Sequence, residues 1–142
     1  FTLQSTDISC NGLADGVASV AAGSPTLTYL WSPGGQTTSS ITGLSAGTYS
    51  VVISDTAVGC TATQQVTISE PDPLAASVLT QDALCSGVNS GLAVATAYGG
   101  TPNYTYSWDT TPTTQNDTAS NLGAGTYTVT VTDSRGCTTT SG

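Results

Sequence analysis

The segment Leu44-Ser-Ala-Gly-Thr-Tyr-Ser-Val-Val-Ile-Ser-Asp55 decides the fold, because it returns as Leu122-Gly-Ala-Gly-Thr-Tyr-Thr-Val-Thr-Val-Thr-Asp133. After the tyrosine, each copy alternates apolar residues with serine, threonine or a second valine. A period of two is typical of an antiparallel strand that has one face in a core and the other in water. The chain is therefore expected to contain the same half-buried strand twice.

The repetition extends well beyond these two strands. Four residues of the first copy recur 75 to 78 residues later: Cys10, Trp31, Tyr49 and Cys60 correspond to Cys85, Trp108, Tyr127 and Cys137. The stretch Glu70-Pro-Asp-Pro73, stiffened by its two prolines, separates the copies. We expect one repeat over residues 1–71 and a second over residues 72–142. The second lacks the last strand, which residues 63–69 supply in the first, so the chain is expected to be part of a longer array.

Short alternating segments between glycine- and proline-rich turns indicate an all-β fold. Strands are expected over residues 16–21, 27–31, 39–41, 49–54 and 66–69 of the first repeat, and at corresponding places in the second. The Leu-x-Ala-Gly-Thr-Tyr segment resembles the corner of immunoglobulin-like folds where a tyrosine hydroxyl bonds back to the backbone. We predict two tandem immunoglobulin-like antiparallel β-sandwiches. Their core aromatic residues are expected to be Trp31, Tyr49, Trp108 and Tyr127.

The four cysteines allow three pairings. A repeat that is copied as a unit can close its own bond, which favours Cys10–Cys60 and Cys85–Cys137, one internal disulfide in each repeat. A sandwich of roughly 70 residues has a small core and needs such a staple. Free thiols or a zinc site are the alternatives, but the sequence has no histidine and no Cys-x-x-Cys spacing. Disulfides would place the protein outside the cytoplasm.

Charge, hydropathy and the spacing of acidic residues together exclude several function classes. Nine acidic residues face a single basic one, Arg135, which disfavours nucleic acid as a partner. No run of about 18 apolar residues is available for membrane insertion. No pair of carboxylates stands among other catalytic signals, so we expect no enzyme. No cofactor or metal site is predicted, although the aspartates at 7, 15, 55 and 133 could offer oxygen ligands to Ca²⁺.

A family pattern runs through both copies. In both copies it reads Cys-x-Gly, then Pro followed by Tyr-x-Trp, then Leu-x-Ala-Gly-Thr-Tyr, and finally Gly-Cys-Thr. The pattern resembles the SprB repeat of Bacteroidetes gliding adhesins and related giant surface proteins. The resemblance implies export by the type IX secretion system and display as a filament on the cell surface.

The function expected from this resemblance is a structural and adhesive repeat of a secreted cell-surface protein, with a role in gliding motility. Neighbouring repeats of the same polypeptide would be its partners, together with surface polysaccharide or the substratum. Two alternatives stay open: an accessory carbohydrate-binding module, which needs an exposed aromatic platform, and a static stalk or matrix repeat.

Three tripeptides match the Asp-Ser/Thr-small pattern associated with O-glycosylation in exported Bacteroidetes proteins. They begin at Asp55, Asp109 and Asp117 and would carry the glycan on Thr56, Thr110 and Thr118. A glycan on such a site would help to solubilise a surface that is poor in charge.

Overall fold

The computed structural model describes residues 1–23, 25–85 and 87–142, and it contains only β-strands and turns over these residues. Within the described part, nothing qualifies as a helix able to cross a membrane. The chain divides into two compact units, Phe1–Glu70 (unit 1) and Pro71–Gly142 (unit 2). This division lies one residue before the boundary expected from the sequence.

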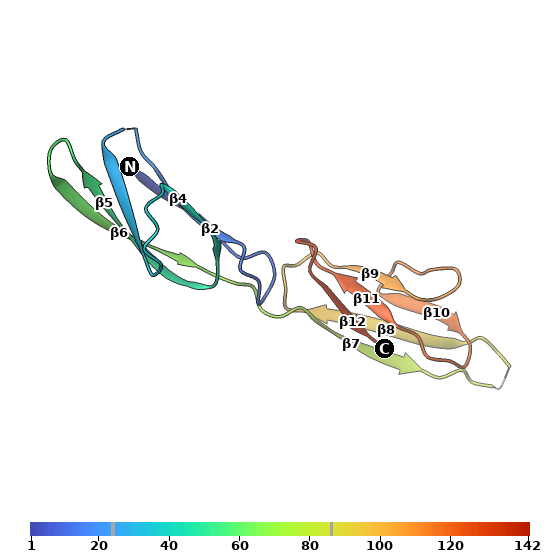
Figure 1. Cartoon of the computed structure of the whole chain (residues 1–142). Coiled ribbons are helices and arrows are strands. Elements are labelled where there is room, and N and C mark those ends of the chain that lie inside the picture. Colours follow the sequence, from blue (N-terminus) through green and yellow to red (C-terminus); the bar gives the residue numbers. More distant parts are fainter. Residues whose placement is uncertain (24, 86) are drawn as a thin grey trace. The chain divides into compact units, whose positions relative to one another are not determined.

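Unit 1 is a sandwich of two three-stranded antiparallel sheets (Figure 1). The first sheet has the order β1-β2-β4, with β1 at Thr2–Thr6, β2 at Gly16–Ala21 and β4 at Ser40–Leu44. The second has the order β3-β5-β6, with β3 at Leu27–Ser32, β5 at Gly47–Asp55 and β6 at Cys60–Ile68. The strand β5 is the repeated segment from which the fold was predicted.

Unit 2 repeats the arrangement strand for strand. One sheet has the order β7-β8-β10, formed by Ala75–Gln81, Gly91–Tyr98 and Thr118–Leu122. The other has the order β9-β11-β12, formed by Thr105–Trp108, Val129–Thr132 and Thr138–Ser141. In both units the first, second and fourth strands face the third, fifth and sixth. This division of strands is that of an immunoglobulin-like sandwich, and the predicted fold class is confirmed.

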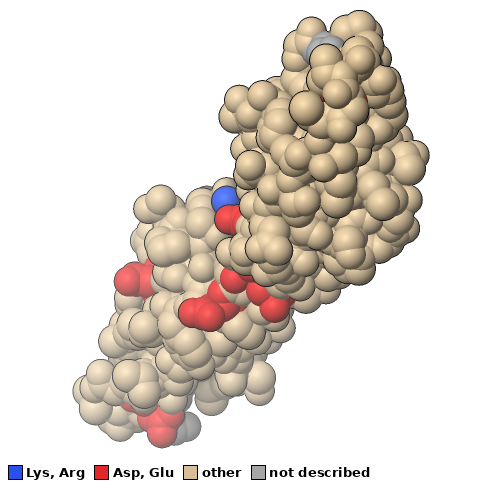
Figure 2. All heavy atoms as spheres, turned by 90° about the vertical axis from the view of Figure 1, so that its left-hand side faces the viewer, with Lys and Arg blue, Asp and Glu red and all other residues tan. Residues whose placement is uncertain are grey.

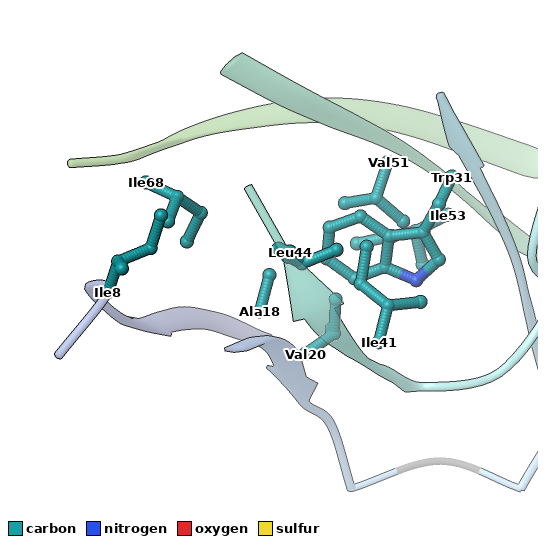
Figure 3. Close-up of a cluster of buried hydrophobic side chains, with 9 residues drawn as sticks. All are labelled: Ile8, Ala18, Val20, Trp31, Ile41, Leu44, Val51, Ile53 and Ile68. Carbon is teal, nitrogen blue, oxygen red and sulfur yellow. The ribbon is translucent and has the colours of Figure 1, made fainter. Parts of the chain in front are cut away.

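The core of each unit lies between its sheets, where alternation points every second side chain inward. Among the residues that the structure describes, unit 1 buries nine apolar side chains, shown in Figure 3: Ile8, Ala18, Val20, Trp31, Ile41, Leu44, Val51, Ile53 and Ile68. The described part of unit 2 buries seven: Ala93, Ala95, Trp108, Ala119, Leu122, Val129 and Val131. The seven occupy the same strand positions as seven of the nine, and the two without a buried counterpart are Ile8 and Ile68. Unit 2 therefore has the smaller core.

The predicted pairing of the cysteines is wrong. Cys60 and Cys85 are free thiols, whereas Cys10 and Cys137 are disulfide-bonded, so neither unit contains the internal bridge expected from the sequence.

In unit 1 the reason is the direction of β6. Cys60 opens this nine-residue strand, whereas Cys10 lies beside its other end, where the amide of Ile8 donates to the carbonyl of Ser69 at 3.0 Å. Eight strand steps separate the two ends by about 26 Å. A disulfide requires Cα atoms less than about 7 Å apart.

The same geometry separates the two cysteines of unit 2. Cys85 follows the end of β7, near the start of β8. Cys137 lies by the other end of β7, because the carboxylate of Asp133 accepts hydrogen bonds from the amides of both Cys137 and Thr101. The length of β7, about 20 Å, stands between them.

Candidate functional site

The two tryptophans are structural anchors and do not form a binding platform. Trp31 and Trp108 are each 1% exposed. Each indole N–H donates across the sandwich to a backbone carbonyl, that of Thr38 at 2.9 Å and that of Asn116 at 3.0 Å. A buried indole with its donor satisfied contributes apolar area without leaving an unpaired polar group.

Both units contain a tyrosine corner. The hydroxyl of Tyr49 donates to the carbonyl of Ser45 at 3.0 Å, and that of Tyr127 donates to the carbonyl of Gly123 at 3.2 Å. Each ring also packs against the core of its unit. The Leu-x-Ala-Gly-Thr-Tyr segment thus fixes the crossing from one sheet to the other, as in immunoglobulin-like domains.

The turn that joins the last two strands is organised by an aspartate. In unit 2 the Asp133 carboxylate is 5% exposed and accepts from the amides of Thr101 at 2.8 Å, Arg135 at 2.9 Å and Cys137 at 2.9 Å. Burial raises the pKa of Asp133, but the hydrogen bonds from these backbone amides lower it by more. The pKa therefore lies below its usual value. The carboxylate is the structural centre of this turn.

The equivalent aspartate of unit 1 makes a looser turn. Asp55 accepts from the amide of Ala57 at 2.8 Å and from the hydroxyl of Thr26 at 2.9 Å, both on one oxygen. The backbone hydrogen bond from Ala57 and the side-chain hydrogen bond from Thr26 lower the pKa of Asp55. Its carboxylate remains more accessible to water than that of Asp133.

The aspartates named as calcium ligands serve as turn and backbone acceptors. Asp7 accepts from the amide of Ser69 at 2.8 Å, and Asp15 accepts from the amide and the hydroxyl of Ser9. Over residues 1–23, 25–85 and 87–142 no three acidic or cysteine side chains gather as a metal site would require.

The three glycosylation candidates differ in accessibility. Thr56 is exposed in the turn between β5 and β6, and its hydroxyl donates to the carbonyl of Thr26 at 3.0 Å. Thr110 is half-buried and its hydroxyl donates to the carbonyl of Pro112 at 2.8 Å and accepts from the amide of Thr114 at 3.0 Å. Thr118 is half-buried at the start of β10. Thr56 offers the least obstructed acceptor of the three.

Exposed aromatic side chains are few on the described surface, and basic ones are limited to Arg135. Tyr98 is the one largely exposed aromatic side chain among the described residues of unit 2, at 55%. The face drawn in Figure 2 is mostly uncharged, with separate groups of carboxylates, and the whole chain has a net charge of −8. A lone tyrosine does not make the aromatic platform that a carbohydrate-binding module needs, and the charge repels phosphates.

Sequence reasoning missed a cleft in unit 2. It has a volume of about 740 Å³ and lies where β7 ends and β8 begins, with Val78, Trp108, Leu122 and Tyr127 among its lining residues. Gly142 also lines it, and an added Cβ there would lie 2.8 Å from the carbonyl oxygen of Tyr127. Unit 2 does have a sixth strand, β12 at Thr138–Ser141, although it is shorter than its counterpart β6 at Cys60–Ile68.

Comparison with known proteins gives a family and a distant structural likeness. The SprB repeat model matches residues 2–36 and 77–113, one match in each unit and together just over half of the chain. No curated protein gives a significant match. Among solved structures, the amphioxus IgVJ-C2 molecule is 16% identical over 97% of this chain and 93% of that one, with a TM-score of 0.40. The two matches to one repeat model, aligned with two copies of one sandwich, show that the chain belongs to the SprB repeat family, which points to a cell-surface repeat of Bacteroidetes adhesins.

Proposed function

We propose that the chain is a non-catalytic spacer and adhesive repeat in a long filament that is exported by the type IX system and propelled during gliding. The observation that supports this proposal most is the recurrence of one sandwich, with the same tryptophan anchor and the same tyrosine corner, on both sides of the connector Glu70–Pro73. Repetition of a closed domain adds length without adding chemistry.

The strand directions suit a domain that bears tension. In unit 1 the chain enters at Thr2, which pairs with Ala21 at the far end of β2, and it leaves at Ile68, which pairs with Gly47. These two points lie at opposite ends of the sandwich. A pull on them runs along β1 and β6 and loads the hydrogen bonds of each ladder together. Because β6 pairs with β5 over its full nine residues, unfolding under tension requires many bonds to break at once.

The composition suits a surface exposed outside the cell. Charged residues make up 7% of the chain, so hydroxyl and amide side chains must keep it in solution. The proposed partners are neighbouring repeats of the same polypeptide, with polysaccharide or the substratum as the adhesive target.

Tracking the repeat on living cells tests this function. Monovalent antibody fragments raised against the folded chain are bound to source cells and followed by fluorescence, with a fragment against an immobile outer-membrane protein as the control. Label that travels along the surface supports a propelled adhesin. Label that is present but fixed refutes the motile role and leaves a static stalk or matrix repeat.

O-glycosylation at Thr56 is part of the same proposal. It is supported by the Asp55-Thr56-Ala57 tripeptide and by the exposure of Thr56 in a turn. Intact mass of the chain produced in the source bacterium is expected to exceed the sequence mass by sugar units, and Thr56→Ala is expected to remove one glycan. Thr110→Ala is the comparison variant, since the Thr110 hydroxyl is already held by its own loop. An unmodified mass excludes the glycan.

A further inference from the structure

We propose that Asn11 is a deamidation site and that Glu70 controls the reaction by holding the attacking amide. The substrate is the chain itself, and water is the co-reactant. Asn11 precedes Gly12, and no other asparagine of the sequence precedes a glycine. Because glycine has no side chain to shield its own amide, Asn-Gly is the asparagine dipeptide most prone to this reaction.

The reaction needs no enzyme. The backbone nitrogen of Gly12 bonds to Cγ of Asn11, and the bond between Cγ and the side-chain nitrogen breaks. The proton of the Gly12 amide leaves with that nitrogen as ammonia, and a succinimide ring remains. Water then opens the ring to aspartate or, through the other carbonyl, to isoaspartate, whose main chain is longer by one carbon.

The structure places Asn11 and Gly12 at the tip of an open turn. The amide of Leu13 donates to the carbonyl of Cys10 at 3.1 Å, and Gly12 has a φ of 78°, as the third residue of a type II turn requires. Asn11 and Gly12 are both exposed, and a Cβ added to Gly12 would meet nothing within 4 Å. The turn itself therefore gives the Gly12 amide little steric protection.

The carboxylate of Glu70 supplies the protection. It accepts from the Gly12 amide at 2.9 Å, across 58 residues of sequence. This hydrogen bond, the Glu70 clamp, must break before the Gly12 nitrogen can turn toward Cγ of Asn11 and give up its proton. A hydrogen bond to a charged acceptor is roughly twice as strong as one between neutral groups, so the clamp raises the barrier to the reaction.

The neighbouring residue in the chain holds Glu70 in place. The amide of Ser69 donates to the carboxylate of Asp7 at 2.8 Å, and the carbonyl of Ser69 accepts from the amide of Ile8 at 3.0 Å. These two hydrogen bonds tie the end of β6 to the segment that leads into the turn, and this brings the Glu70 carboxylate to Gly12. The clamp is thus part of the fold of unit 1.

Unit 2 contains the same turn without the reactive side chain. The amide of Val88 donates to the carbonyl of Cys85 at 3.2 Å, and Gly87 has a φ of 81°. The sequence has serine before this glycine, where unit 1 has Asn11. The turn therefore does not require asparagine, and unit 2 is an internal control for the reaction.

Deamidation opposes the clamp. Both products place a new carboxylate one residue before Gly12, and its negative charge repels that of Glu70. Isoaspartate also lengthens the turn. Glu70 is the first residue of the connector Glu70–Pro73, so the reaction loosens the point at which the connector leaves unit 1.

Ageing of the purified chain at mildly alkaline pH, followed by peptide mass mapping, tests the site and the clamp. Glu70→Ala is expected to raise the rate of conversion at Asn11 about tenfold, the effect of losing one hydrogen bond to a charged group. Asp72→Ala removes the same charge two residues further along and is expected to leave the rate unchanged. Equal rates in the wild-type chain and both variants would overturn the clamp.

The order of conversion tests the choice of asparagine. In the Glu70→Ala chain, Asn11 is expected to convert ahead of the other four asparagines, at positions 89, 103, 116 and 121. Unchanged hydrogen exchange at the buried residues Val51 and Ile53 shows that unit 1 is still folded in this variant. Conversion of another asparagine ahead of Asn11 would overturn the site.

The variant Asn11→Asp reproduces one product and tests the loosening. Its Gly12 amide is expected to exchange about fivefold faster than that of Asn11→Ser, which introduces the side chain found in unit 2, because two nearby carboxylates repel each other even in water. Equal exchange in the two variants would show that the new charge leaves the clamp intact, and it would overturn the proposed loosening of the connector.

Discussion

Replacing Asp133 by asparagine is expected to destabilise unit 2 by about 3 kcal/mol. One carboxylate oxygen accepts from the amides of Arg135 and Cys137, and the other accepts from the amide of Thr101 at 2.8 Å. Asparagine has a single acceptor oxygen, so its NH₂ group must face an amide donor. One buried N–H then loses its acceptor at a cost of about 1–3 kcal/mol, and the bonds that remain lose the benefit of a charged acceptor.

The pH dependence identifies the carboxylate as the cause. Because the folded-state pKa of Asp133 is lowered, its contribution to stability is complete above the unfolded pKa of about 4 and disappears as the pH falls through the folded pKa. Asparagine does not titrate. The difference in unfolding free energy between Asp133→Asn and the wild-type chain is therefore expected to be largest near neutral pH and to shrink below about pH 4.

Hydrogen exchange at the buried residues Val129 and Val131, followed with urea denaturation, measures the stability of unit 2 separately. Asp55→Asn in unit 1 is the matched control and should cost less, because Asp55 is less buried and its hydrogen bonds from Ala57 and Thr26 fall on one oxygen that an asparagine carbonyl can replace. A loss below about 0.5 kcal/mol for Asp133→Asn, or one that is independent of pH, would show that the turn does not depend on this carboxylate.

Three further outcomes are expected. Tyr49→Phe and Tyr127→Phe should each lower the unfolding free energy of their own unit by about 1 kcal/mol, since each removes one hydroxyl–carbonyl hydrogen bond. Calorimetry that shows no change would mean that the tyrosine corner does not stabilise the sandwich. Ile68→Ala should destabilise unit 1 by about 3 kcal/mol in urea unfolding, as expected for a fully buried isoleucine, and a loss under about 1 kcal/mol would mean that this end of the core can collapse. Alkylation of the folded chain, read by peptide mass mapping, should modify Cys60 and Cys85 alone, and labelling of other cysteines without reductant would contradict the bonding state.

Alternation along a strand reports burial directly, and so the centre of the fold could be predicted. The residues around Val51 and Ile53 occupy the predicted strand, and Trp31 lies in the core. The start of β6 was not foreseen, because residues 60–62 read Cys-Thr-Ala and show no clear alternation. This edge strand is largely exposed on both faces, and a strand without a buried face has no apolar period to detect.

The predicted cysteine pairing was wrong because a sequence repeat shows which residues correspond, but not the direction in which each strand runs through the sandwich. Cys10 follows the first strand of its sandwich and Cys60 opens the last, and strands that alternate in direction place these two points at opposite ends. The cleft of unit 2 could not be derived from composition or spacing, since it depends on which end of the sandwich the last strand closes. That information is contained in the register of β5 and β6.

The position of Arg135 has a consequence for survival in a protease-rich environment. Enzymes that cut after lysine or arginine find one target in the whole chain, the Arg135–Gly136 bond. That bond lies in the turn before β12, and the amides of Arg135 and Cys137 on either side of it donate to Asp133. A trypsin-like protease needs an extended substrate, so this turn must open before it can be cut. The rate of digestion by such enzymes is therefore limited by how often the turn at Arg135 unfolds locally.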